Sequence, residues 1–262
     1  MSTSPVPTQS PSPSQSFQHP GCFNLSIVQH NCLGSSNVFQ TLFSFFTTVE
    51  SSPHIVALQD IPLCRNCPPV FRNYKCFFPP ATHSYKPRVA TYVHKRLLSD
   101  NSILPLFFER GDLMAVNFHS PEEPFNTSDN LFRLYNAYSI PSGHTRSVSP
   151  VDLFPQHDFP ILVLGDLNIH HSASDPTRLL SNYDQFISFP YFDRASAQFF
   201  SLLNMPGVYT MFPFTSHHHP AVLDLSFANT ALLPFFPPPG TPPSRQLVQI
   251  IPTSQSFSPL RS

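Results

Sequence analysis

The sequence predicts an α/β (α+β) fold, a layered sandwich in which sheets and helices pack around a common core. Short apolar or β-branched runs recur along the chain, which is typical of strands covered on both faces. Segments with helical periodicity lie between some of these runs. Apolar residues make up 40% of the chain and 27 residues are phenylalanine, so a buried core can form.

Each strand candidate is a run of apolar and β-branched residues bounded by polar or proline-marked loops. In chain order the candidates are Leu25–His30, Ile55–Gln59, Arg88–Val93, Met114–Phe118, Arg133–Ala137, Ile161–Gly165 and Val222–Phe227.

Helices are predicted where apolar residues recur at spacings of three and four positions. The first is Asn37–Val49, which is rich in phenylalanine and should pack one face into the core. The others are Thr177–Ser188, with Pro176 placed to start the helix, and Asp193–Leu203.

Composition excludes several classes of protein. Of 262 residues, 32 are proline and 11% are charged. The formal net charge of −1 argues against a protein that binds nucleic acid through a general basic field. No apolar run is long enough to cross a membrane. The first residues have neither the basic nor the apolar part of a secretory signal. We therefore expect an intracellular protein with no membrane partner, and no specific protein partner is evident.

The chain divides into three predicted regions. Residues 1–20 are rich in Ser, Pro, Gln and Thr and are expected to be a disordered leader. Residues 21–236 form the predicted domain. Residues 237–262 form a proline-rich tail.

Polar residues that could carry chemistry cluster at the ends of predicted strands, where a rigid sheet can aim them. Each of them alone is more often a turn or capping residue, so the argument depends on the set. It consists of Asn31, Asp60, Tyr138, Asp166, Asn168 and Asp224.

The set suits hydrolysis of a phosphodiester. A hard cation such as Mg²⁺ needs few protein oxygens besides water and phosphate, and Asp60 could supply a carboxylate. Asp166 could act as the base that activates water, and Tyr138 could donate a hydrogen bond to phosphate. Asn168 lies two residues beyond Asp166, so in an extended chain both side chains point to the same side.

These residues occur in order within VQHN, IVALQD, YNAYSIPSG, LVLGDLN and VLDLSFAN. In this respect the chain resembles the endonuclease/exonuclease/phosphatase superfamily, and is most similar to endonuclease domains of fungal non-LTR retrotransposons. The resemblance covers roughly residues 24–236. It implies a four-layered sandwich of two packed mixed β-sheets flanked by helices, with Mg²⁺ or Mn²⁺ as cofactor and DNA as the partner that is nicked.

The resemblance also implies a role for each residue. Asn31 and Asp60 would lie at the metal, and Tyr138 would contact the phosphate. Asp166 and Asn168 would activate water and stabilise the transition state. Asp224 would orient a terminal catalytic histidine.

Two departures from the family pattern stand out. The metal position is usually Glu, and the shorter Asp60 reaches less far towards a cation. The family also ends in a Ser-Asp-His motif on a last strand. This chain has no acidic residue after Asp224 and no histidine after His219, so the motif is absent and the sandwich is expected to lack its last strand.

A frameshift would explain the missing motif. Residues 245–252 can be encoded as CGT CAA CTG GTT CAG ATC ATA CCN, and the same bases read from the third position give Ser-Thr-Gly-Ser-Asp-His-Thr. We hypothesise a frameshift near residues 237–244, with chance codon compatibility as the alternative. Coding DNA that is incompatible with GGT TCA GAT CAT would exclude it.

Three functions follow from the sequence as alternatives. The first is a retrotransposon endonuclease domain with impaired activity, which would need access to the nucleus. The second is a catalytically inactive domain that binds nucleic acid or is the remnant of a decayed element. The third is a phosphatase of the same superfamily. Basic residues form two small clusters, Lys86 with Arg88 and Lys95 with Arg96, and either could contact phosphate.

Overall fold

The computed structural model describes residues 25–48, 52–98, 103–119, 130–140, 148–204, 223–236 and 248–252. The predicted leader and most of the predicted tail lie outside these ranges. None of the described helices is long and apolar enough to cross a membrane.

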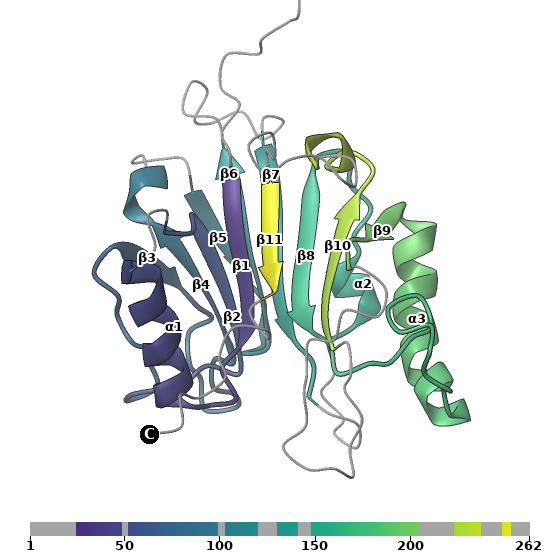
Figure 1. Ribbon diagram of the computed structural model, residues 1–262, viewed down its shortest axis with the longest axis horizontal. Coiled ribbons are helices and arrows are strands. Elements are labelled where there is room, and N and C mark those ends of the chain that lie inside the picture. The colour runs from purple at the N-terminus through teal and green to yellow at the C-terminus, as the bar shows by residue number, and fades with distance from the viewer. Residues whose placement is uncertain are drawn as a thin grey trace, which may run out of the picture.

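The strands form two mixed sheets (Figure 1). In the first sheet the order is β11-β1-β2-β4-β3, with β1 parallel to both β2 and β11 and the other pairs antiparallel. Its strands are β1 (Leu25–Asn31), β2 (Ile55–Gln59), β3 (Tyr74–Phe77), β4 (Val89–His94) and β11 (Val248–Pro252).

In the second sheet the order is β5-β6-β7-β8-β10-β9, with only β7 and β8 parallel. Its strands are β5 (Ile103–Phe107), β6 (Leu113–His119), β7 (Asn130–Tyr138), β8 (Ile161–Asp166), β9 (Phe200–Leu202) and β10 (Asp224–Asn229).

Helices cover the outer faces of the two sheets. Figure 1 shows α1 beside the first sheet and α2 and α3 beside the second. The predicted four-layered sandwich is therefore confirmed. The helices are α1 (Ser36–Thr48), α2 (Pro150–Leu153) and α3 (Asn182–Ala197), with short 3₁₀ turns η1 (Lys95–Leu97) and η2 (Leu233–Phe235).

Alternation along the strands divides the core into three clusters, because successive side chains point to opposite faces. On β1, Ile27 packs between the sheets and Val28 packs under α1. On β8, Leu164 packs between the sheets, whereas Val163 packs outward with Tyr191 of α3. Strands buried on both faces in this way explain the nearly continuous apolar runs in the sequence.

A set of buried amides crosses the space between the sheets. Gln59 of β2 donates to the side-chain oxygen of Asn136 on β7 at 2.7 Å. Asn136 in turn donates to the backbone oxygens of Leu58 and Ala90 at 3.2 and 3.0 Å. These bonds satisfy polar groups that would be costly to bury alone, and they fix how the sheets face each other.

The region of residues 177–203 differs from prediction. We predicted two helices here, Thr177–Ser188 and Asp193–Leu203. A single helix, α3, instead starts at Asn182, where Ser181 and Asp184 form a reciprocal capping box. The helix continues through Pro190, and β9 occupies part of the second predicted helix.

The edge of the first sheet also differs from prediction. We expected the sandwich to lack its last strand, which would leave an unpaired sheet edge. Instead β11 pairs with β1 in parallel register, from Leu25 opposite Val248 to Gln29 opposite Pro252. The β-branched run of the tail can therefore pair with the backbone groups of β1 that an open edge would leave exposed.

Candidate active site

The six predicted site residues come together at one end of the sandwich. Asn31 ends β1 and Asp60 directly follows β2, its neighbour in the sheet. Tyr138 ends β7 and lies opposite Asp166, which ends β8. Asp224 begins β10 and also lies opposite Asp166. Strand ends of both sheets therefore converge, with Asn168 following in the loop after β8.

Asp166 lies at the centre of this group and is only 3% exposed. The side-chain amide of Asn31 donates to one carboxylate oxygen at 2.5 Å, and the backbone N–H of Asn168 donates to the other at 3.2 Å. Burial, together with the negative charge of Asp60, raises the pKa of Asp166 to about 7, although both hydrogen bonds act to lower it. A carboxyl with this pKa can accept a proton near neutral pH.

We expected the chain to stay extended from Asp166 to Asn168, but it does not. Its φ of +49° lies in the left-handed region, and its side-chain amide donates to the backbone oxygen of Ser139 at 2.7 Å. The Asn168 side chain therefore ties the end of β8 to the end of β7. Its backbone N–H, rather than extended geometry, links it to Asp166.

Gly165 explains why this turn has the sequence Gly-Asp-Leu-Asn. A Cβ atom at Gly165 would lie 2.8 Å from the backbone oxygen of Ala137 and 3.0 Å from a methyl group of Leu167. The absence of a side chain thus lets β8 approach β7 closely just before Asp166.

Asp60, Arg88 and Tyr138 form a second group beside Asp166. Arg88 donates to Asp60 at 2.6 Å, and its guanidinium carbon lies 4.3 Å from the centre of the Tyr138 ring. Burial raises the pKa of Tyr138 to about 12, and the charge of Asp60 adds to this increase. The Tyr138 hydroxyl therefore stays protonated at neutral pH and can act as a hydrogen-bond donor.

Neither a protein-family model nor a curated protein matches the chain. Solved structures do. The endonuclease domain of TRAS1, a telomere-specific non-LTR retrotransposon, superposes with a TM-score of 0.55 and 14% identity, over 79% of this chain and 87% of that one. The AP endonuclease LMAP from Leishmania major gives 0.59 and 14%, over 79% of each chain. A variant of the 3′ phosphatase NExo from Neisseria, bound to a product DNA hairpin, gives 0.52 and 13%, over 81% and 89%.

The chain has the endonuclease/exonuclease/phosphatase fold. The similarity extends over most of the chain, as the sequence resemblance implied. The closer relation to fungal retrotransposons stays a prediction.

The two residues that the resemblance places at a metal, Asn31 and Asp60, lie at neighbouring strand ends. Asn31 is the last residue of β1 and pairs with Gln59 of β2, which Asp60 directly follows. The side-chain oxygens of Asn31 and Asp60 are hard donors of the kind that Mg²⁺ and Mn²⁺ prefer. Among the residues that the structure describes, no three His, Cys, Asp or Glu side chains gather closely enough to hold a metal. One carboxylate and one amide fit an ion that keeps waters and takes substrate oxygens. The carboxylate of Asp60, however, is already paired with Arg88.

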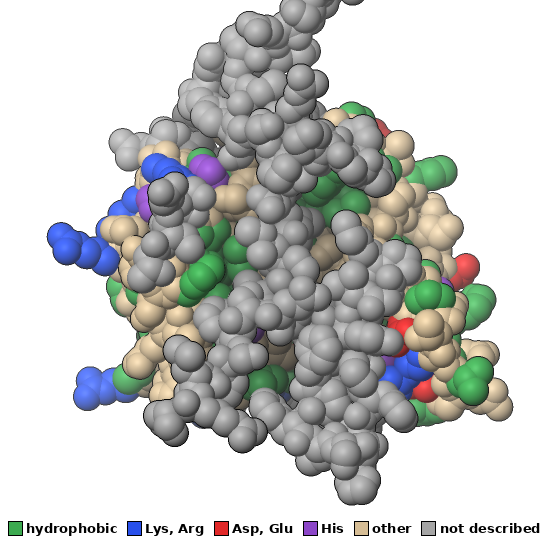
Figure 2. All heavy atoms as spheres, viewed as in Figure 1, with side chains coloured by type: hydrophobic (Ala, Val, Ile, Leu, Met, Phe, Trp, Pro, Cys, Tyr) green, Lys and Arg blue, Asp and Glu red, His purple; other side chains and the backbone are tan. Residues whose placement is uncertain are grey.

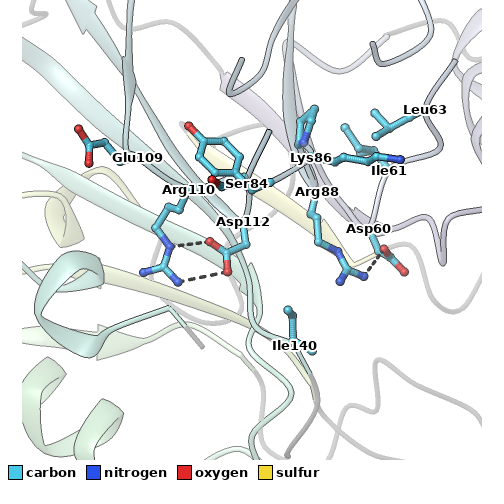
Figure 3. Close-up of a pocket in the computed structure, with 13 residues that line it drawn as sticks. Asp60, Ile61, Leu63, Ser84, Lys86, Arg88, Glu109, Arg110, Asp112 and Ile140 are labelled. Atoms are coloured by element: carbon cyan, nitrogen blue, oxygen red, sulfur yellow. Dashed lines mark hydrogen bonds and ion pairs between the residues drawn. The ribbon is translucent and has the colours of Figure 1, made fainter. Parts of the chain in front are cut away.

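A groove of 850 Å³ opens beside Asp60 (Figure 3). The ion pairs Arg88–Asp60 and Arg110–Asp112 line it, and Figure 3 shows them next to each other. Lys86 also lines this groove. The sequence predicts Lys86 and Arg88 as candidate phosphate contacts, but it indicates neither Arg110 nor the pairing of Arg88 with Asp60.

On the face that Figure 2 shows, charged side chains are dispersed among the described residues. Lys and Arg side chains project at the edge beside α1 and β3, and Asp and Glu side chains lie mainly at the opposite edge beside α3, with some Lys or Arg among them. The groove cations Lys86, Arg88 and Arg110 are therefore the candidates for contact with a phosphate backbone.

Proposed function

We propose that this chain is a phosphodiester hydrolase domain that nicks DNA with the help of Mg²⁺ or Mn²⁺, and that it derives from a retrotransposon. The observation that carries the proposal is the buried Asp166 carboxyl, with a raised pKa, placed between Asn31 and the ends of β7 and β10. Perturbed carboxyls in a cluster of polar strand ends mark functional sites.

In this proposal Asp166 takes a proton from the attacking water. Its pKa of about 7 balances the fraction that is deprotonated against its strength as a base. Asn31 orients the carboxylate through its hydrogen bond. Tyr138 donates to a phosphate oxygen. A bound Mg²⁺ or Mn²⁺, held through Asn31 and Asp60, would supply positive charge to the phosphate.

The proposal includes impaired turnover. Asp224 lies opposite Asp166. The family resemblance implies that Asp224 orients a terminal catalytic histidine, but no histidine follows His219 in the sequence. Loss of a general acid–base group commonly costs about 10²–10⁴ in rate. We therefore expect slow nicking that still depends on Asp166.

A second candidate is a domain that binds DNA without cleaving it. The Asp60–Arg88 ion pair favours this candidate, because it occupies the carboxylate that a metal would need. Under this alternative the groove cations contact the phosphate backbone and turnover is absent. A phosphatase of the same fold would instead release phosphate from a small phosphomonoester.

A plasmid-nicking assay distinguishes these functions. We expect conversion of supercoiled to open-circular DNA with Mg²⁺ or Mn²⁺, none with EDTA, and a loss of at least about 100-fold in Asp166→Asn. Asp193→Asn, at an exposed position of α3, is the matched control and should nick like the native chain.

The other outcomes separate the alternatives. Nicking that is unchanged in Asp166→Asn would refute the proposed mechanism. Binding of a DNA duplex, measured by fluorescence anisotropy, without nicking would support the binding module. Release of phosphate from a small phosphomonoester without nicking would support the phosphatase.

A further inference from the structure

The Asp60–Arg88 pair lies at the position where the resemblance puts a metal ligand. The side chains of Asp60 and Arg88 are 26% and 35% exposed, so the 2.6 Å contact is only partly buried. Ion pairs with this exposure are weak, and either partner can exchange for a competing ion. The pair is therefore poised to open when a stronger partner for one of the two groups arrives.

The backbone holds both partners in place. Asp60 has a φ of +43°, and its backbone oxygen accepts a hydrogen bond from Gly34 at 2.7 Å. The backbone N–H of Arg88 donates to the oxygen of Gly111 at 2.7 Å, and its own oxygen accepts from Ile61 at 3.3 Å. These hydrogen bonds anchor the backbone at both residues, so rotation of the side chains is the direct way for the pair to separate.

Arg88 also reaches into the candidate active site. Its guanidinium lies over the ring of Tyr138, and the charges of both Asp60 and Asp166 act on the Tyr138 hydroxyl. A guanidinium has five N–H donors in a planar fork that matches a phosphate oxygen pair. Figure 3 shows the group beside Asp60 at the wall of the groove.

We propose that Arg88 and a divalent cation compete for the Asp60 carboxylate, and that a phosphodiester resolves the competition by binding the Arg88 guanidinium. The inference rests on the proposed function, because it concerns the same metal position. A cation on Asp60 would place two positive groups on one carboxylate unless Arg88 moves away. A phosphate bound to Arg88 draws the guanidinium away from Asp60 and removes this repulsion. Metal and phosphodiester therefore each increase the affinity of the chain for the other.

Titration with Mn²⁺, followed by the loss of the free-ion electron paramagnetic resonance signal, tests the competition. We expect Arg88→Gln to bind Mn²⁺ at least about threefold more tightly than the native chain, since the competing charge is gone. Asp60→Asn should bind more weakly. Arg72→Gln removes a charge from an exposed loop position outside the groove and should match the native chain.

Dimethyl phosphate, a small phosphodiester, tests the second half of the proposal. It should increase the Mn²⁺ affinity of the native chain and have no effect on that of Arg88→Gln. Arg88→Lys keeps the charge without the planar fork, so it should keep weak Mn²⁺ binding and show a smaller phosphate effect. Circular dichroism and thermal unfolding verify that each variant is folded.

Equal Mn²⁺ affinity in the native chain and Arg88→Gln would overturn the proposal, and so would a phosphate effect that does not depend on Arg88. Insensitivity of Mn²⁺ binding to Asp60→Asn would also overturn it, because the metal would then lie elsewhere. None of these measurements involves DNA cleavage. A chain that never nicks DNA but shows Arg88-dependent coupling would refute the proposed function and leave this inference standing.

Discussion

The side-chain amide of Asn31 donates a hydrogen bond to the buried carboxylate of Asp166, across the two sheets of the sandwich. Asn31 ends a strand of the first sheet and Asp166 ends a strand of the second. One contact thus makes the geometry of the candidate site depend on how the sheets pack. It also affects the proton affinity of the proposed base, because it favours the charged form of the carboxyl.

Replacing Asn31 with Ala should raise the pKa of Asp166 above its value of about 7. The variant removes a donor that stabilises the carboxylate, while the burial of Asp166 persists. The measurement is a ¹³C NMR titration of aspartate carboxyl groups in the presence of EDTA, with Asp166→Asn to assign the signal. Asn182→Ala, at an exposed position of α3, should leave the titration unchanged. A lower pKa in Asn31→Ala would contradict the role given to this bond.

Asp166 should also make the fold less stable as pH rises from about 4 to about 7. Its folded pKa is raised from 3.8 to about 7, so in this window the folded chain holds a proton that the unfolded chain has released. The stabilisation is complete below pH 4 and is lost as pH rises through 7. Each pKa unit corresponds to roughly 1.4 kcal/mol, so the effect amounts to a few kcal/mol.

The comparison is between the native chain and Asp166→Asn, unfolded by urea at several pH values with EDTA present. The free energy of unfolding of the variant, minus that of the native chain, should increase between pH 4 and 7. Taking the difference matters because His30, whose burial lowers its pKa to about 4, contributes the opposite trend in both proteins. A difference that stays constant across the window would show that Asp166 is not buried as a protonated acid.

Much of the site was predictable because the signals are local. Strands β2 and β8 have strong apolar runs, and a polar residue directly after such a run must lie at a sheet end. Asp60 and Asp166 could therefore be placed before the fold was known. Their proximity followed from the resemblance, not from spacing.

The rest depends on contacts between distant parts of the chain. The pairing of Asp60 with Arg88 joins two loops, and the buried bond between Gln59 and Asn136 joins the two sheets. Periodicity carries no information about either. Strand β11 was missed for a related reason, since its β-branched run was interpreted only as a frame-shifted tail and its partner β1 lies at the other end of the sequence.

Pro190 shows how tertiary packing overrides a local signal. We predicted separate helices on either side of this residue, yet α3 runs through it, with Tyr191 buried in the core beside it. Proline removes a backbone hydrogen bond within the helix, so the packing of α3 must compensate. Replacing Pro190, which is exposed, with Ala should therefore raise the free energy of unfolding by about 1–3 kcal/mol.

Urea unfolding measures this change. Ser196→Ala, at an exposed position near the end of the same helix, is the control and should have a much smaller effect. A loss of stability in Pro190→Ala would mean that the ring makes contacts that outweigh the missing hydrogen bond.

Gly165 gives the most direct link between a single sequence position and the geometry of the site. Replacing Gly165 with Ala would put a Cβ atom 2.8 Å from the backbone oxygen of Ala137. Strands β7 and β8 would then have to separate directly before Asp166. We expect a loss of about 1–3 kcal/mol in the free energy of unfolding, measured with urea. Gly34→Asn is the control, because no atom lies within 4 Å of a Cβ there and Asn tolerates the φ of +63°. If the two variants were equally stable, the close approach of β7 to β8 would not be what requires glycine in this turn.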